Sequence, residues 1–226
     1  MTMKLLLQIL ASFVGSALLL GLLLFLPAGT FNYWQAWVFI VVFLVTTTIF
    51  GVYFSIKDPA LMRRRRQAGP TSEQSTLQKI VSTIALASLF VLPILSGLDH
   101  RFGWSQMPLF VSLIGDALLV FSFIMFYFVF RVNSYGAGNI QVEQGQEVIS
   151  TGPYALVRHP MYDGSLVMGI GMALALGSWW TLVLLVIMIP VLIIRVLDEE
   201  KVLARGLPGY TTYEQQVRYR LVPYLW

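Results

Sequence analysis

Residues 107–130 read MPLFVSLIGDALLVFSFIMFYFVF, an apolar run whose one charged side chain is that of Asp116. A transmembrane α-helix needs about 20 mostly apolar residues to cross roughly 30 Å of hydrocarbon, and this run meets that length. Residues 5–26, 33–56 and 77–97 meet it as well. These four segments predict a helical membrane protein.

A fifth apolar stretch, residues 164–195, is long enough for two short passes. Its middle carries Gly177, Ser178, Trp179 and Trp180, and paired tryptophans are typical of a membrane–water interface. We therefore expect a C-terminal helical hairpin that turns at these residues, which brings the total to about six spans. The first apolar run is longer than the core of a signal peptide, so we expect it to be retained.

The composition agrees with an all-α, polytopic transmembrane helical bundle. Hydrophobic residues make up 57% of the chain and charged residues 12%, whereas a soluble domain has about 25% charged residues. The sequence contains no cysteine, which excludes a disulfide scaffold and a zinc–cysteine site. Its two histidines, His100 and His159, are too far apart for a usual histidine metal motif. We therefore expect neither a metal ion nor a nucleic acid as a partner.

The lysines and arginines predict the orientation, because cytoplasmic loops are enriched in them. Of the 15 basic residues, Arg101 alone falls on the opposite side of a six-span arrangement, and Lys4 precedes the first span. We therefore expect an integral, multi-pass membrane protein with both termini in the cytoplasm. The run of arginines at 63–66 is interpreted as a topology determinant without chemistry.

Two features inside the predicted spans are interpreted as structural. Small residues such as Gly164, Gly169 and Gly171 are typical of close helix contacts, and no strand precedes them as a dinucleotide-binding motif requires. Asp116 lies several turns inside its span, where we expect it to form a hydrogen bond between helices. Neither feature is assigned to the site.

Polar residues gather in two places after the fourth span. The first is a glycine-interrupted loop at residues 131–147, followed by STGPYALVRHPMYDG at residues 150–164. Pro160 favours an extended His159 and can itself begin the next helix. The free amides at the start of that helix are suited to an anionic ligand at the membrane surface.

The second place is RVLDEEK at residues 195–201. Arg195 and Glu199 lie one turn apart on one helix face. Because the hairpin returns to the side it entered from, we expect them close to His159 and Tyr162. The two clusters together predict a site with apolar helices beside it.

A series of motifs runs through this C-terminal part of the chain. They are GPY at 152–154, RHPxYxG at 158–164, the apolar hairpin, RxxxEE at 195–200, LPGYxxY at 207–213 and VxxR at 217–220. The series resembles the isoprenylcysteine carboxyl methyltransferase family, and related membrane methyltransferases that act on phospholipid amines share much of it. The first four spans match only as generic membrane helices.

We expect a single domain of residues 1–226, with four N-terminal membrane spans in 1–130, and the resemblance implies that 131–226 is a cofactor-binding catalytic region. It implies S-adenosylmethionine as the cofactor, bound in a cytoplasmic pocket. It makes Arg195 the catalytic and substrate-binding arginine, and Tyr210 and Tyr213 supporting residues. The cofactor-binding residues that it implies are Gln141, Gln146, Glu147, Val148, Ile149, Tyr154, His159, Pro160, Met161, Tyr162 and Glu199.

The chemistry of methyl transfer agrees with these residues. Displacement at a sulfonium methyl needs alignment and exclusion of water, and it needs no covalent nucleophile or metal. An acceptor carboxylate is already ionised and needs a cation such as Arg195 to place it, whereas an amine needs a base. A lipophilic carboxylate, such as that of a prenylated cysteine, is therefore the first candidate acceptor.

Three alternatives stay open from the sequence. One is a phospholipid amine N-methyltransferase, for which Glu199 or Glu200 would serve as the base. Another is a non-enzymatic membrane transport or assembly protein with the same fold. The third is an NADPH-dependent reductase of the broader membrane family.

Overall fold

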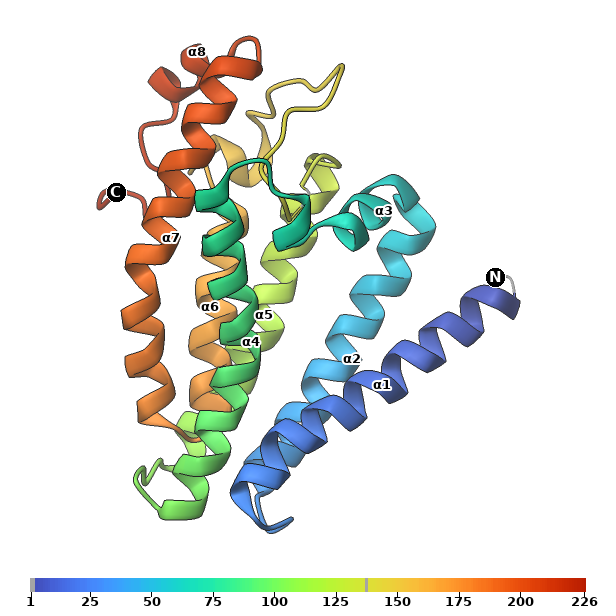
Figure 1. The fold of residues 1–226 in the computed structure, drawn as a ribbon, viewed down its shortest axis with the longest axis vertical. Coiled ribbons are helices and arrows are strands. Elements are labelled where there is room, and N and C mark those ends of the chain that lie inside the picture. The colour runs from blue at the N-terminus through green and yellow to red at the C-terminus, as the bar shows by residue number, and fades with distance from the viewer. Residues whose placement is uncertain (1–2, 137) are drawn as a thin grey trace. The chain divides into compact units, whose positions relative to one another are not determined.

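The computed structural model describes residues 3–136 and 138–226, and for residues 4–6 it describes the backbone alone. The side chain of Lys4, expected on the cytoplasmic side, therefore lies outside the described part. All regular elements among the described residues are helices (Figure 1). The predicted all-α fold class is confirmed. The α-helices are α1 (Met3–Ala28), α2 (Trp34–Lys57), α3 (Pro59–Gln67), α4 (Thr76–Phe102), α5 (Leu109–Val132), α6 (Pro160–Ala175), α7 (Trp179–Gly206) and α8 (Tyr210–Gln216), and 3-10 helices lie at Pro70–Ser72 and Gly152–Ala155.

Five of these helices are long and apolar enough to cross a membrane, namely α1 from Leu7 onward, α2, α4, α5 and α7. The four single spans predicted from the sequence are confirmed as helices. The predicted hairpin corresponds to α6 and α7. Helix α6 has 16 residues, which is about 24 Å at a rise of 1.5 Å per residue. Many large apolar side chains on these helices are exposed, among them Leu22, Ile49 and Phe110, as expected of surfaces that face lipid.

Contacts divide the chain into two compact units. Unit 1 comprises Met1–Tyr53, Ser88–Phe123 and Val167–Ile187, and unit 2 comprises Phe54–Ala87, Ile124–Leu166 and Met188–Trp226. The single domain expected from the sequence stays a prediction.

Unit 1 has an apolar core to which α1, α2, α4, α5 and α6 contribute buried side chains such as Leu24, Phe39 and Leu119. Helices α5 and α6 approach each other closely in it. A Cβ atom added at Gly115 would collide with the backbone of Ala175, and one at Gly171 would lie 2.8 Å from the amide nitrogen of Leu119. The expected role of small residues in close helix contacts is confirmed at this crossing.

The hairpin turns at residues 176–178. Gly177 has a φ of +73°, a conformation that side chains with a Cβ rarely adopt. The Ser178 hydroxyl accepts a hydrogen bond from the Thr181 amide at 3.1 Å. Because a serine in this position caps a helix, α7 begins directly after it. Trp179 and Trp180, predicted in the turn, are therefore the first two residues of α7.

Asp116 is buried in unit 1, and neither of its carboxylate oxygens has a hydrogen-bond partner among the described residues. The hydrogen bond between helices that we expected at Asp116 is thus not found there. The residues that pack against the preceding Gly115 are Gly171, Leu174 and Ala175. None of them carries a side-chain donor.

Unit 2 contains two short helices that the sequence analysis did not predict, α3 and α8. Asp58 caps α3, because its carboxylate accepts a hydrogen bond from the Leu61 amide at 2.9 Å, and Pro59 occupies the first turn. The arginine run at 63–66 therefore lies on a helix anchored by the fully buried Leu61. As expected, α6 begins at Pro160.

Candidate functional site

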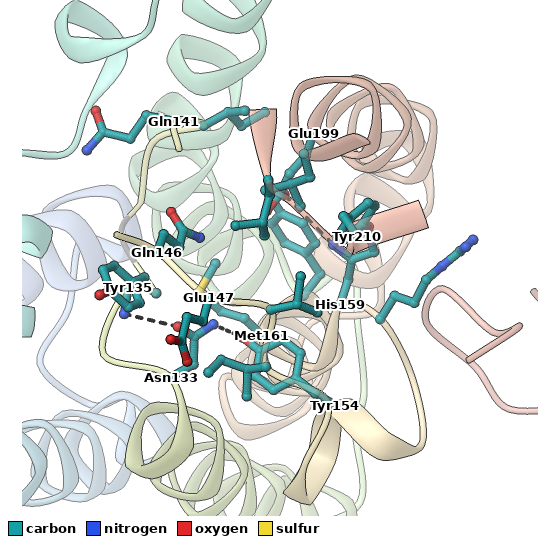
Figure 2. Close-up of a pocket in the computed structure, with 18 of the residues that line it drawn as sticks. Asn133, Tyr135, Gln141, Gln146, Glu147, Tyr154, His159, Met161, Glu199 and Tyr210 are labelled. Atoms are coloured by element: carbon teal, nitrogen blue, oxygen red, sulfur yellow. Dashed lines mark hydrogen bonds and ion pairs between the residues drawn. The ribbon is translucent and has the colours of Figure 1, made fainter. Parts of the chain in front are cut away.

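Unit 2 holds a pocket between the loop after α5, the start of α6, the end of α7 and the start of α8 (Figure 2). Its empty space is about 780 Å³, and this figure includes space that is open to solvent. The lining residues are Asn133, Tyr135, Gly136, Asn139, Ile140, Gln141, Gln146, Glu147, Val148, Ile149, Tyr154, Arg158, His159, Met161, Tyr162, Glu199, Leu203, Leu207 and Tyr210.

All of the cofactor-binding residues implied by the sequence line this pocket except Pro160. Pro160 is instead the first residue of α6. The side-chain amide of Gln141 points away from the other labelled side chains in Figure 2, and it donates to Glu143 Oε1 at 3.5 Å. The structure thus brings the implied set together at one place, and the binding role of each residue stays a prediction.

The two polar clusters of the sequence meet at the Tyr162 hydroxyl. This hydroxyl donates to Glu199 Oε2 at 2.6 Å, and it accepts a hydrogen bond from Arg195 Nε at 3.2 Å. Arg195 and Glu199 are therefore linked through Tyr162 rather than by a direct ion pair. Tyr162 fixes the position of the Glu199 carboxylate in the pocket wall.

Arg195 itself does not line the pocket. Its guanidinium is buried and forms an ion pair with Glu73 at 2.6 Å. It also donates to Gln78 Oε1, to Ser82 Oγ and to the carbonyl oxygen of Gly138, each at 2.8–2.9 Å. Because a carboxylate, two polar side chains and a loop carbonyl occupy its donors, Arg195 holds the surrounding elements together.

Glu73 is a residue that the sequence analysis missed. Its side chain is fully buried, and its second oxygen accepts a hydrogen bond from the Ile140 amide at 3.1 Å. Glu73 and Arg195 together therefore fix the loop that carries the pocket residues Asn139 and Ile140. The signal that could have identified Glu73 is physical: a buried arginine requires a carboxylate partner.

Glu200 organises the other side of the site. It forms ion pairs with Arg158 at 3.0 Å and with Arg220 at 2.8 Å, and its Oε1 lies 3.3 Å from His159 Nε2. The backbone amide of His159 donates to the carbonyl oxygen of Arg220 at 2.9 Å. The C-terminal segment thus holds the His159 ring in place at the pocket.

Tyr210 and Asn133 are pocket residues to which the sequence analysis gave no direct role. The hydroxyl of Tyr210 is buried and has no hydrogen-bond partner among the described residues. Asn133 Nδ2 donates to the Tyr154 hydroxyl at 2.7 Å. Burial raises the pKa of Tyr154 and of Tyr210, so both phenols are neutral donors at physiological pH.

These features fit S-adenosylmethionine, which carries a positive sulfonium, an amino acid group and a flat purine ring. Glu147 and Glu199 supply negative charge, and four tyrosine rings supply flat apolar surface. The unpartnered hydroxyl of Tyr210 is a buried donor that a ligand would satisfy. In the described part of the chain, no group of three or more His, Cys, Asp or Glu side chains is placed to bind a metal ion.

Comparison with known proteins agrees with the geometry. Residues 110–208 match the family model described as phospholipid methyltransferase. No curated protein and no solved structure matches the chain. The matched segment contains the whole pocket lining except Tyr210. This match confirms the resemblance to membrane methyltransferases over residues 110–208.

Proposed function

We propose that the protein transfers a methyl group from S-adenosylmethionine to a lipophilic acceptor. The observation that carries the proposal is the convergence of the implied cofactor residues on one pocket of unit 2, within the segment that matches the methyltransferase model. When bound, S-adenosylmethionine supplies a methyl group on a positively charged sulfur, which leaves as a neutral thioether when the acceptor takes the methyl.

The residues of the pocket have separate tasks in this proposal. The Glu199 carboxylate, held by the Tyr162 hydroxyl at 2.6 Å, attracts the positive charge of the cofactor. The hydroxyl of Tyr210 donates a hydrogen bond to the bound cofactor. Apolar side chains, among them Ile140 and Leu207, line the pocket and exclude water from the reacting groups.

Arg195 acts through its neighbours in this proposal. Arg195 is 8% exposed and is paired with Glu73. In this proposal it therefore positions Tyr162 and the loop at Gly138 and does not contact the acceptor directly. The sequence-based expectation that Arg195 grips an acceptor carboxylate stays a prediction. A residue that holds Tyr162 and, through it, Glu199 affects methyl transfer by alignment.

A carboxylate, such as that of a prenylated cysteine, is our first candidate acceptor. It is ionised at neutral pH and needs no base, and the neutral phenol of Tyr154 is a donor suited to an anion. A phospholipid amine is the second candidate, because the matched family model is described as phospholipid methyltransferase. In that reaction Glu147 or Glu199 would take the amine proton.

One experiment distinguishes these acceptors. Membranes that contain the protein are incubated with methyl-labelled S-adenosylmethionine and either a farnesylcysteine analogue or phosphatidylethanolamine, and the lipids are then treated with base. We expect label in the farnesylcysteine product that base releases as methanol, since a methyl ester is hydrolysed and an N-methyl group is not. Base-stable label in phosphatidylethanolamine would instead support the amine reaction.

Calorimetry of the purified protein tests the remaining alternatives. The proposal requires that S-adenosylmethionine binds and that Glu199→Ala weakens this binding. Absence of binding would favour a non-enzymatic membrane protein, and binding of NADPH in its place would favour a reductase.

A further inference from the structure

Helix α3 places Arg65 beside the pocket. Its Nη1 donates to the carbonyl oxygen of Gly136 at 3.2 Å and lies 3.8 Å from the sulfur of Met161, and both of these residues line the pocket. The centre of its guanidinium lies 4.6 Å from the middle of the Phe130 ring, near the end of α5. Arg65 is nevertheless exposed, so a ligand at the mouth of the pocket can reach it.

Arg65 differs from the other arginines that contact the pocket lining. Arg64, Arg158 and Arg195 each form an ion pair with a glutamate. Arg65 forms none with any carboxylate in residues 3–136 and 138–226. The surrounding protein desolvates its guanidinium and lowers the pKa of Arg65, and no acid offsets this effect. Arg65 is thus an exposed cation without a counter-charge in the described part of the chain.

We propose that Arg65 binds the anionic group of the lipophilic acceptor, a carboxylate or a phosphate, at the mouth of the pocket. This inference rests on the function proposed above. A guanidinium recognises both groups through paired, charge-assisted hydrogen bonds. Phe130 lies near the end of α5, a helix long and apolar enough to cross a membrane. A lipid with its tail beside α5 would therefore present its polar end near the cation stacked on Phe130.

The test uses the full chain in phosphatidylcholine vesicles, with Arg65→Gln, Arg65→Lys and the control Arg66→Gln. Arg66 is exposed on the same helix and is not among the residues that line the pocket, so its replacement removes the same charge at a position outside the lining. We expect Arg65→Gln to raise the KM for the acceptor about 10-fold to 100-fold, as for the loss of a charge-assisted hydrogen bond. The affinity for S-adenosylmethionine and the kcat should stay within twofold of wild type. Arg65→Lys should recover part of the loss, and Arg66→Gln should behave as wild type.

A binding measurement keeps this test independent of turnover. Farnesylcysteine and phosphatidylethanolamine are titrated onto protein saturated with S-adenosylhomocysteine, with octadecylamine as a lipid that lacks an anionic group. Weaker binding of farnesylcysteine in Arg65→Gln identifies the carboxylate, and loss of the preference for phosphatidylethanolamine over octadecylamine identifies the phosphate.

Unchanged affinity for both lipids, or no binding of either, overturns the proposal about Arg65. Weakened S-adenosylmethionine binding with unchanged acceptor binding also overturns it, because the anion would then be the cofactor carboxylate. Failure of methyl transfer with intact lipid binding counts against the proposed function alone.

Discussion

Two tyrosines of α8 differ in what their hydroxyls contact. The hydroxyl of Tyr210 is buried without a partner among the described residues, whereas that of Tyr213 donates to the carbonyl oxygen of Tyr154 at 2.8 Å. We predict that Tyr210→Phe weakens S-adenosylmethionine binding about 2-fold to 10-fold, the effect of one hydrogen bond. The stability of the ligand-free protein should not fall, because the substitution removes an unsatisfied polar group. Calorimetry and thermal unfolding without ligand measure the two effects.

The control for this prediction is Tyr213→Phe. It removes a hydrogen bond that the protein makes with itself, so it should lower the free energy of unfolding by about 1 kcal/mol. Its effect on ligand binding should be the smaller of the two. Equal cofactor affinity of Tyr210→Phe and wild type would contradict the role given to Tyr210.

The buried pair of Glu73 and Arg195 gives a second prediction at this scale. Glu73→Gln leaves the Arg195 guanidinium buried without a counter-charge, which should lower the free energy of unfolding by about 3–5 kcal/mol. The double variant Glu73→Gln with Arg195→Gln removes both charges and should recover part of that loss. Methyl transfer should remain low in the double variant, because Tyr162 has lost the donor that orients it. Unfolding in detergent mixtures and the transfer assay measure these effects.

Ser82→Ala is the matched control. Ser82 contacts both members of the pair, through hydrogen bonds at 2.9 Å to Glu73 and 2.8 Å from Arg195, but it carries no charge. Its replacement should cost about 1 kcal/mol. A Glu73→Gln protein as stable as Ser82→Ala would refute the importance of the ion pair.

The site shows what the sequence does and does not reveal about single residues. His159, Tyr162 and Glu199 were predicted together because they belong to short motifs at the two ends of a hairpin. Glu73 belongs to no motif, and its partner Arg195 lies far along the chain. Such a pair depends on how distant segments pack. Arg65 could not be predicted as a site residue for the same reason. The sequence indicated only that its charge marks the cytoplasmic side, whereas its contact with Met161 depends on where α3 packs.

At the scale of elements, the long spans were predictable and the short helices were not. Span length and apolarity identify α2, α4, α5 and α7 without any knowledge of packing. Helix α3 has four consecutive arginines and no apolar stripe, so periodicity could not reveal it. The cap at Asp58 followed by Pro59 was its one local signal. Trp179 and Trp180 were predicted in the turn because paired tryptophans are typical of a membrane–water interface. The start of α7 depends instead on the cap formed by Ser178.

The crossing of α5 and α6 gives the prediction that belongs to this scale. A Cβ at Gly115 would collide with the α6 backbone at Gly171 and Ala175. Gly115→Ala should therefore force the helices apart and lower the free energy of unfolding by about 1–3 kcal/mol. Unfolding in detergent mixtures measures the change.

Gly51→Ala in α2 is the control, since nothing lies within 4 Å of a Cβ at that position. Alanine is favoured over glycine inside a helix, so this variant should be more stable by about 0.5–1 kcal/mol. Opposite signs for the two substitutions are the expected result. A Gly115→Ala protein as stable as Gly51→Ala would show that the close approach is not required.

For the whole molecule, charge is distributed differently in the two units. Every ion pair found within the described residues lies in unit 2, with Glu73, Glu143, Glu199, Glu200 and Glu214 as its acids. In unit 1 the buried Asp99 instead accepts hydrogen bonds from Ser105 and Ser178. Unit 2 therefore carries the ion pairs around the proposed ligand site, and packing and hydrogen bonds hold unit 1 together.

The orientation of the chain is the last prediction, and the absence of cysteine from the sequence makes it directly testable. Single cysteines are introduced by Gln67→Cys at the end of α3, Gln106→Cys between α4 and α5, and Leu225→Cys near the C-terminus, all exposed positions. Because lysines and arginines favour cytoplasmic loops, a membrane-impermeant maleimide should label Gln67→Cys and Leu225→Cys from the cytoplasmic face and Gln106→Cys from the other. The contact of Tyr162 at the start of α6 with Glu199 near the end of α7 requires both ends of the hairpin on one side, so α6 should cross the membrane despite its 16 residues. Labelling of Leu225→Cys from the same face as Gln106→Cys would show that α6 does not cross the membrane. It would also place the C-terminus on the side opposite to α3.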